Sequence, residues 1–477
     1  MAELHDLSAL DLWRALQKGE TSPTDVTEHV IERAERHNAQ LGAFVTVTPD
    51  AARQRAAMVQ SSVPRTSRLW GLPLADKDLV NRAGVPTGFG SRLFQGVEPA
   101  ASDELVEVLD AAGAVSIGKT ATPEFGLAGY TEPLATGPVR NPWDLTRGVG
   151  GSSGGAAAAV AARILPFAPG SDGGGSIRIP AAACGLVGIK PSRGLVPSAS
   201  GITSLGGLSV GGALARTVTD AALLLDGMIG RVNGRIEHHY TLRAPDDNDG
   251  DLLGAAVRGE GRYQLGVMTN TPFDGELDIV VDAAAAAAVD EATARFADMG
   301  HGIEEFELAH DGRYAQRFLA LWHASAASLP IEGSRLEQLE PLTRHLVERG
   351  RSMSARDLTA VLGALSEFER SVIAQFSRFD AVLTPTLALT PRPLGWFDAE
   401  DPERNFRQQC EYEPYTSFVN VAGLPAITLP LVQTETGLPM GVQLIGRPGG
   451  EATLFALGTQ LERRVRWQDR RPGDFSR

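Results

Sequence analysis

Three residues of this chain have side chains that could together activate a serine for attack on a carbonyl carbon. Lys77 stands in LPLADKDLV, Ser152 in VGGSSGG and Ser176 in GSDGGGSIRIP, so an amine, a hydroxyl and a candidate nucleophile occur in order. A serine that attacks a carbonyl needs a base. No histidine lies between His37 and His238. The base expected for a serine here is therefore a lysine.

A run of three glycines stands directly before Ser176. Gly173, Gly174 and Gly175 tolerate the backbone conformations that turn successive N–H groups into one concavity. Such donors suit a negatively charged oxygen. The run therefore indicates an anion-binding loop next to the candidate nucleophile.

Lys77 can act as a base only when it is neutral. An exposed lysine has a pKa near ~10.4, a useful base needs roughly 7–8, and burial away from acids lowers the pKa of an amine. Asp76 and Asp78 flank Lys77, but on a strand their side chains would point to the opposite face. The alternative is a surface lysine paired with Asp78, and these residues taken alone favour it.

Shorter patterns point to other chemistry. GAVSIGKT (113–120) matches a phosphate-binding loop, but that loop follows a strand and opens a helix, whereas here a helix precedes it. We expect instead a buried strand that ends in a surface lysine, Lys119. Ser116 and Lys119 also have the SxxK spacing of penicillin-binding enzymes, without the SDN or KTG motifs that accompany it.

A more serious rival is the nucleophile elbow of α/β-hydrolases. GSSGG (151–155) has the GxSxG pattern and would make Ser153 the nucleophile of an esterase, with a downstream base such as His238, His239 or His323. An elbow follows a strand, and the preceding DLTRGVGG is too polar and glycine-rich to predict one.

Helix and strand patterns alternate around these residues. Ser22 to Asp25 predict a helix start, with an N-cap serine, a proline and an acid. GLPLADKDLV places Lys77 at or just past a strand end. Helices are predicted over 156–162, behind the first glycine cluster, and over 215–230. This alternation predicts an α/β architecture with helices on both faces of a sheet.

Composition and net charge limit the classes of binding partner and cofactor. The net charge of −14 and the lack of a basic stretch argue against nucleic acid or an anionic membrane as partner. Cys184 and Cys410 give no disulfide framework and no metal-ligand spacing. We find no secretory signal and no apolar run long enough to span a bilayer. We therefore expect a cytoplasmic protein that uses no metal and no cofactor.

Longer motifs, taken in order, resemble the amidase signature family. They are GLPLADKD, GKTATPEFG, RNPWDLTR, GGSSGG, GSDGGGSIRIPAAACGLVGIKPSRG, ARTVTDAALLLD, NVAGLPAITLP and GLPMGVQLIGRP. They span most of residues 1 to 230 and 375 to 465, and Lys77, Ser152 and Ser176 stand at the family's spacing. The TEP, RNPW and GGSSGG segments further resemble its 6-aminohexanoate cyclic-dimer hydrolase branch.

The resemblance implies one amidase domain over residues 1–477. Its amidase-signature α/β/α fold would have a central mixed β-sheet covered by helices on both faces. The core would comprise 60–230 and 375–465. A helical, substrate-facing region would lie at about 305–410.

The resemblance also assigns roles. Ser176 would carry the acyl group, and Ser152, after a cis peptide bond, would relay a proton to Lys77. Gly173, Gly174 and Gly175 would form the oxyanion hole. The family usually has threonine or another bulky residue where Gly173 stands, so the extra glycine is expected to loosen this hole.

Three further residues are expected to support the site: Ser153, Asp172 and Arg178. Asp172 and Arg178 flank the nucleophile as a buried pair or as two solvated charges. Arg178 lies in the apolar segment SIRIP, which favours the pair.

The expected activity is hydrolysis of the C–N bond of a linear or cyclic small-molecule amide. Within the same fold, the alternative is the glutaminase subunit of a tRNA-dependent amidotransferase, against which the acidic chain argues. A catalytically dead binding protein is disfavoured by the intact lysine and serines. A homo-oligomer is left open.

Overall fold

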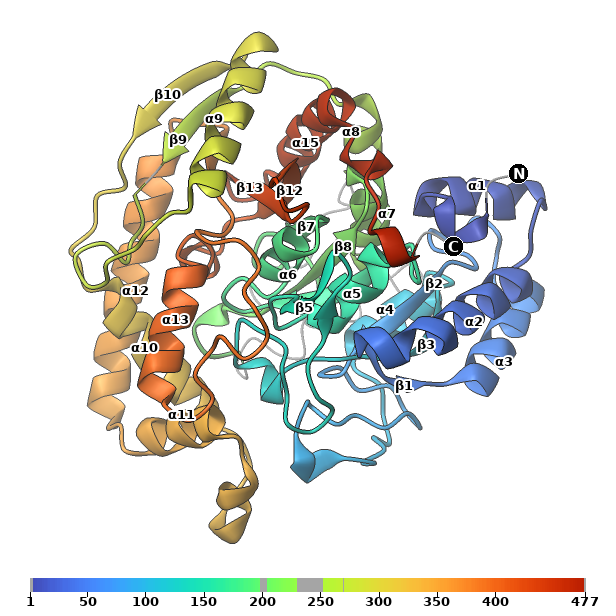
Figure 1. Cartoon of the computed structure of the whole chain (residues 1–477), viewed down its shortest axis with the longest axis horizontal. Helices are drawn as coiled ribbons and strands as arrows, with labels where there is room; N and C mark the ends of the chain where they lie inside the picture. Colours follow the sequence, from blue (N-terminus) through green and yellow to red (C-terminus); the bar gives the residue numbers. More distant parts are fainter. Residues whose placement is uncertain (1–2, 198–203, 230–251, 269, 476–477) are drawn as a thin grey trace.

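The structure, a computed structural model, describes residues 3–197, 204–229, 252–268 and 270–475 (Figure 1). Its centre is an eight-stranded mixed sheet in the order β10-β9-β11-β13-β12-β7-β8-β6. The strands are β6 (Phe167–Asp172), β7 (Val187–Lys190), β8 (Val210–Ala215), β9 (Gln264–Met268), β10 (Gly302–Phe306), β11 (Ala381–Pro385), β12 (Ala426–Gln433) and β13 (Pro439–Gly446). The strands β10, β9 and β11 run parallel, and the remaining neighbours pair antiparallel.

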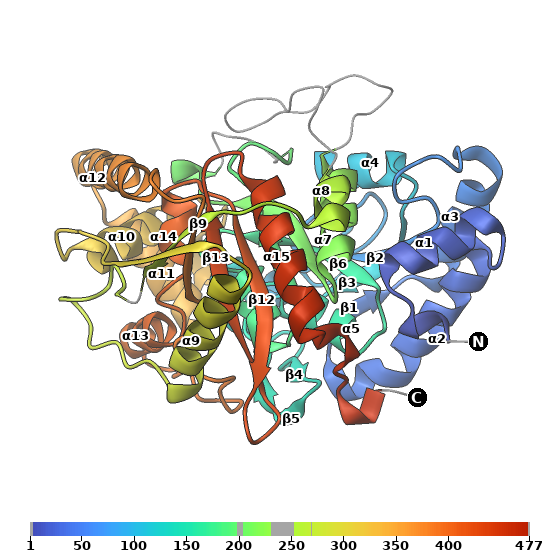
Figure 2. The ribbon, with the colours of Figure 1, turned by 90° about the horizontal axis from the view of Figure 1, so that it is seen from above.

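Helices cover both faces of this sheet, as predicted. On one face lie α7 (Val218–Met228), α9 (Ala283–Asp298) and α15 (Glu451–Val465); Figure 2 shows α9 and α15 over β12 and β13. On the other face lie α5 (Gly154–Ala161) and α6 (Arg178–Ala183). Alternation along β12 explains the two layers: Ile427 and Leu429 meet Gly458 of α15, whereas Thr428 lies opposite Gly188, which packs against α6.

The N-terminal part adds a second, smaller sheet in the order β1-β3-β2. Its strands are β1 (Phe44–Val47), β2 (Pro73–Lys77) and β3 (Val115–Thr120), and the accompanying helices are α1 (Ala9–Lys18), α2 (Pro23–Leu41), α3 (Pro49–Ser62) and α4 (Glu104–Ala111). The strand β2 packs against β6 of the central sheet. This contact brings the end of β2, where Lys77 stands, to the end of β6.

Residues 305–410 are largely helical and return once to the central sheet as β11. The helices are α10 (Tyr314–Ala327), α11 (Pro341–Arg351), α12 (Ala355–Phe376) and α13 (Pro402–Tyr412). After them come the short helix α14 (Ser417–Val421) and the last two strands of the sheet. The short helix α8 (Leu252–Arg258) lies beside α15 and α7.

Most predicted elements are present, and their ends explain the differences. Ser22 caps α2 in a full capping box with Asp25, as its sequence predicts. The helix predicted over 215–230 begins only at Val218, because Thr217 caps it and Ala215 still belongs to β8.

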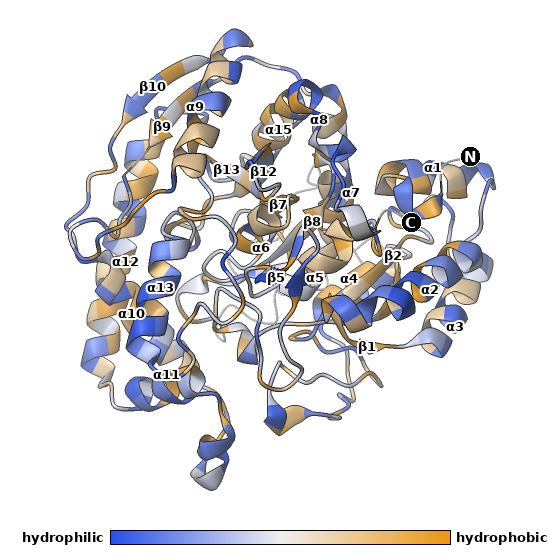
Figure 3. Ribbon diagram, in the orientation of Figure 1, coloured by the Kyte–Doolittle hydropathy of each residue, from blue (hydrophilic) through white to orange (hydrophobic). Residues whose placement is uncertain are grey.

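Two expectations were wrong, one about a polar segment and one about a lysine. Residues Asp144–Gly148 form a strand, β5, paired with β4 (Arg140–Asn141) in a two-stranded sheet. Figure 3 shows β5 as hydrophilic, and a hairpin outside the central sheet needs no apolar face. The strand β3 ends as predicted, but its Lys119 is buried rather than on the surface.

No helix in the described part of the chain combines the length and the apolar character that a membrane span requires.

Candidate active site

Lys77 is buried where β2 ends, with only 1% of its surface exposed. Its Nζ lies 2.7 Å from Oγ of Ser152 and 3.0 Å from Oγ of Ser171. Burial lowers the pKa of Lys77 to about 7, while the negative charge of Asp172 opposes the shift. A substantial fraction of the amine is therefore neutral at neutral pH.

The two acids beside Lys77 are committed elsewhere. Asp76 pairs with Arg82 and accepts a hydrogen bond from the Ser116 hydroxyl. Asp78 accepts the N–H of Gly88 and forms an ion pair with Lys119. The alternative of a surface Lys77 paired with Asp78 was therefore wrong.

The segment that carries Ser152 is fixed between β2 and the nucleophile loop. The Gly151–Ser152 peptide bond is cis, as the family resemblance implied. The next residue, Ser153, is fully buried: its N–H donates to the carbonyl of Ser176 at 3.1 Å, and its hydroxyl donates to the carbonyl of Ser171 at 3.3 Å. Ser153 thus joins the two glycine-rich loops.

Ser176 follows β6 through the glycine run. The N–H of Gly175 donates to Oδ1 of Asp172 at 2.7 Å, so this donor is already used. Within the described residues, the N–H groups of Gly173, Gly174 and Ser176 have no hydrogen-bond partner. The N–H groups of Gly173 and Gly174 are thus free to bind an oxyanion, whereas that of Gly175 is not. The N–H of Ser176 is a third free donor.

Asp172 and Arg178 form the predicted buried ion pair, with 2.9 Å between Nη2 and Oδ1. Burial alone would raise the pKa of Asp172, but the Arg178 guanidinium and the Asn420 amide hold it below its ordinary value. Arg178 also donates to Oε1 of Gln443 at 2.7 Å and to the carbonyl of Thr416 at 2.9 Å. The pair therefore fixes the start of the nucleophile loop to α14 and β13.

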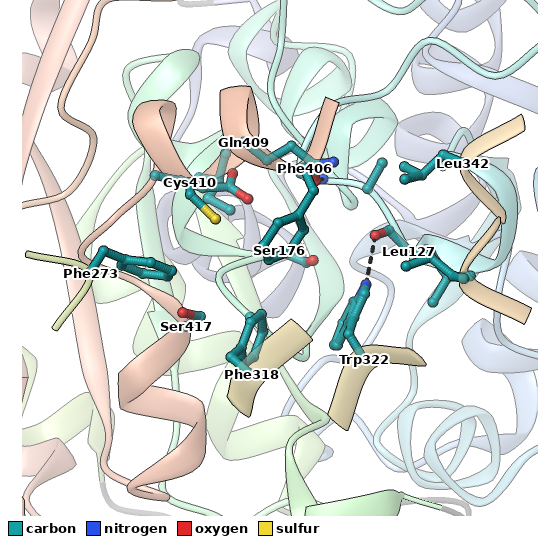
Figure 4. A pocket seen from close by; sticks show the side chains of 17 residues that line it. Leu127, Ser176, Phe273, Phe318, Trp322, Leu342, Phe406, Gln409, Cys410 and Ser417 are labelled. Atoms are coloured by element: carbon teal, nitrogen blue, oxygen red, sulfur yellow. Dashed lines mark hydrogen bonds between the residues drawn. The ribbon is translucent and has the colours of Figure 1, made fainter. Parts of the chain in front are cut away.

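Ser176 opens into a cavity between the central sheet and the helical region, which we call the Ser176 cavity. In Figure 4, Phe318 and Trp322 lie on one side of Ser176, and Phe406, Gln409 and Cys410 on another. The lining residues are Gly126, Leu127, Ala128, Gly129, Gly174, Ser176, Ile179, Phe273, Phe318, Trp322, Leu342, Leu346, Phe406, Gln409, Cys410, Glu413 and Ser417. Thus α10, α11 and α13 of the helical region face this cavity.

Sequence reasoning missed several residues of the site. Ser171 contacts Lys77, and Thr416 donates its hydroxyl to the carbonyl of Gly174 at 2.7 Å. Gly126 has a φ of +69°, and a methyl group added there would overlap Leu79 and approach Oγ of Ser152 to 3.3 Å. Gly126 lies in the motif GKTATPEFG, so the signal was present but had not been assigned a role.

The strand β5 does precede GSSGG, as an elbow requires, but the printed partner of the Ser153 hydroxyl is the Ser171 carbonyl and not a base. His323 lies on α10 with its ring beside His345, and it is not among the residues that line the cavity. His238 and His239 lie outside the described residues. Lys119, the lysine of the phosphate-loop pattern, forms an ion pair with Asp78 and donates hydrogen bonds to Thr87 and to the carbonyl of Val80.

The part of the chain that the structure describes contains no group of three or more His, Cys, Asp or Glu side chains placed to hold a metal ion.

We compared the chain with protein families, with curated proteins and with solved structures. The model of the Amidase family matches residues 25–455. A putative amidase, AmiB2, from Mycobacterium tuberculosis is 37% identical over 463 residues, covering 96% of both chains.

Two solved structures are similar along almost the whole chain. The 6-aminohexanoate cyclic dimer hydrolase in complex with its substrate superposes with a TM-score of 0.89 at 28% identity, covering 100% of both chains. A bacterial aryl acylamidase of the amidase signature family superposes with a TM-score of 0.85 at 25% identity, covering 98% of both chains.

Proposed function

The chain belongs to the amidase family and is an amide hydrolase, and we propose that it works through an acyl-enzyme on Ser176, with Ser152 as bridge and Lys77 as base. The observation that carries this mechanism is the 2.7 Å hydrogen bond between the buried Lys77 amine and the Ser152 hydroxyl. A lysine whose pKa is lowered to about 7 can accept a proton near neutral pH.

In the first half-reaction, neutral Lys77 takes the proton of Ser152 as Ser152 takes the proton of Ser176. The Ser176 oxygen forms a bond to the substrate carbonyl, and the N–H groups of Gly173, Gly174 and Ser176 hold the resulting oxyanion. When the tetrahedral intermediate collapses, the C–N bond breaks. The leaving nitrogen receives the proton back from Lys77 through Ser152, and an ester on Ser176 remains.

In the second half-reaction, water replaces the amine. Lys77, through Ser152, removes a proton as the water oxygen attacks the ester carbonyl. The Ser176 oxygen leaves and takes a proton back, and the acid product departs. The net reaction consumes one water and one amide, and it yields one carboxylic acid and one amine.

The cavity walls support a substrate with an apolar body. Four aromatic rings line the cavity, those of Phe273, Phe318, Trp322 and Phe406. Cyclic aliphatic amides and aryl amides are the first candidates, because the similar structures are named as a cyclic dimer hydrolase and an aryl acylamidase. We propose a small-molecule amide rather than a nucleic-acid-bound substrate, given the net charge of −14.

The test is to locate the nucleophile and measure the activity together. A fluorophosphonate should label Ser176, as mapped by peptide mass spectrometry, and Ser176→Ala should abolish hydrolysis across a panel of aliphatic, aryl and cyclic amides that includes glutamine. Ser152→Ala should be severe, whereas its matched neighbour Ser153→Ala should be milder. A label on Ser153 with Ser176 unmodified would restore the elbow mechanism.

A further inference from the structure

Glu413 caps the C-terminal end of α13 and lines the Ser176 cavity. Its Oε2 is buried and has no hydrogen-bond partner among the described residues. The carboxyl group lies against Gly129, where an added methyl group would overlap both carboxyl oxygens. The backbone at Gly129 therefore lies against the carboxyl group but gives its Oε2 no hydrogen bond.

Groups near Glu413 that could pair with it are already occupied. The N–H of Gly129 donates to Oε1 of Gln409 at 2.8 Å, and Nε2 of Gln409 donates to Asn405 at 2.6 Å. The guanidinium of Arg178 is committed to Asp172 and to neighbouring oxygens. No cation is left to compensate a charge on Glu413 within the described site.

The charge state of Glu413 follows from these surroundings. Burial raises its pKa well above the ordinary value; the charge of Asp172 acts in the same direction, and Arg178 opposes it. The Cys410 thiol and the Tyr412 phenol also interact electrostatically with Glu413, and burial raises the pKa of both. Burial and the charge of Asp172 thus both favour the protonated form of Glu413, which has one O–H donor and one carbonyl acceptor.

The other polar side chains of the cavity offer less to a substrate. The Ser417 hydroxyl is hydrogen-bonded to the Tyr314 hydroxyl at 2.9 Å, Gln409 is used at both ends, and Cys410 carries only a weak S–H donor. Most of the remaining side chains are apolar: Leu127, Ile179, Phe273, Phe318, Trp322 and Phe406. Apart from the nucleophile, Glu413 is thus the strong polar side chain of the described lining that has no internal partner.

We propose that Glu413 recognises a second amide group of the substrate, which makes diamides and oligoamides with an apolar spacer the substrate class; this inference rests on the function proposed above. A neutral carboxyl group matches an amide, because its O–H donates to the amide carbonyl while its carbonyl accepts the amide N–H. A substrate that lacks the second amide leaves the buried Oε2 of this acid unpaired, which costs binding free energy.

The experiment compares terminal diamides of increasing methylene number with monoamides in which a methyl group replaces the second amide. The quantity is the ratio of kcat/KM between the two members of each pair. For at least one chain length, we expect the wild type to favour the diamide by about a hundredfold or more. E413Q, which keeps a neutral donor and acceptor, should retain the ratio, and E413L should bring it near one. The matched control is E411L on the same helix, outside the cavity.

The pH dependence of this ratio tests the role of Glu413 further, because a purely structural role would not make the ratio depend on pH. As the pH rises and Glu413 ionises, the wild-type ratio should fall, whereas the E413Q ratio should stay level. If E413L does not fold, as judged by circular dichroism, G129A replaces it, because the added methyl displaces the carboxyl group while Glu413 remains.

The outcomes separate this inference from the proposed function. Hydrolysis that depends on Ser176 but shows the same ratio in wild type and E413L overturns the inference alone. A wild-type preference for ω-amino amides that E413Q abolishes also overturns it, because Glu413 would then act as a carboxylate. Absence of hydrolysis of every amide overturns the proposed function and the inference with it.

Discussion

Two lysines end neighbouring strands of the small sheet and are equally hidden from solvent, yet their partners differ. Lys77 ends β2 with 1% exposed, and Lys119 lies near the end of the parallel strand β3 with 0% exposed. Lys119 is 3.4 Å from the Asp78 carboxylate and also reaches Thr87 and a backbone carbonyl. Among the residues that the structure describes, Lys77 reaches only oxygens of Ser152 and Ser171.

Burial lowers the pKa of both amines, so burial alone does not distinguish a base from a structural ion. The distinction comes from the acids. Asp78 compensates the charge of Lys119 directly. The acid that acts on Lys77 is Asp172, whose charge is already held by Arg178 and Asn420. A buried lysine becomes available as a base where the nearby acids are paired with other groups.

The largest expected effect is the loss of activity on replacing Lys77. Lys77→Ala should reduce kcat/KM by about a thousandfold or more, since it removes the general base and the proton relay together. Lys77→Arg should fail as well, because arginine stays protonated. Steady-state kinetics on the best amide of the panel measure both.

The matched control is His323→Ala, which removes a buried imidazole outside the cavity. If that variant lost activity while Lys77→Ala kept it, the comparison between the two lysines would have no catalytic meaning.

The second expected effect concerns stability and falls on the other lysine. Lys119→Met leaves the Asp78 carboxylate buried without its cation, and the free energy of unfolding should fall by about 3–5 kcal/mol. Activity per folded molecule should stay close to that of the wild type. Urea denaturation followed by circular dichroism measures the loss. Adding Asp78→Asn should recover part of it; a fully additive double mutant would mean that the two groups do not interact.

A third prediction uses pH to read the charge state of Lys77. Its pKa is lowered from 10.5 to about 7, and the working form is the deprotonated amine, so activity should be low in acid, rise through about pH 7 and stay high above it. Below the midpoint, kcat/KM should fall about tenfold per pH unit. A flat profile from pH 5 to 9 would exclude titration of the base in this range.

The sequence sufficed for the parts of the molecule that depend on local patterns. The capping residues around Ser22, the strand that ends at Lys77 and the alternation behind the α/β fold are all readable from neighbouring residues. The buried pair of Asp172 and Arg178 also followed from a charge embedded in an apolar segment.

What the sequence did not show depends on contacts between distant segments. The burial of Lys119 follows from Asp78, Val80 and Thr87, which lie 32 or more residues away. Glu413 gave no signal, since a single acid at the end of a helix is ordinary until the fold places it against Gly129. Ser171 had no assigned role in the glycine-rich run GSDGGGS, and only the contact of β2 with β6 brings it to Lys77.

The smallest expected effect comes from Ser171, which we regard as a positioning residue for Lys77. A neutral amine has two N–H donors and one lone pair. The hydroxyl and the carbonyl of Ser171, at 3.0 and 3.4 Å, can take both donors and leave the lone pair for the Ser152 hydroxyl. Ser171→Ala should lower kcat/KM about tenfold, through kcat rather than KM, because one of these two acceptors is lost.

The same change should also move the pH profile. The hydroxyl oxygen of Ser171 stabilises the charged ammonium more than the neutral amine, so its loss should lower the pKa of Lys77 further and shift the midpoint of activity to lower pH. Ser171→Thr, which restores a hydroxyl, should recover both the rate and the midpoint. Ser116→Ala, which removes a buried hydroxyl bonded to Asp76, is the control and should leave the midpoint in place. A rate loss in Ser171→Ala without a shift of the midpoint would mean that Ser171 supports β6 and not the base.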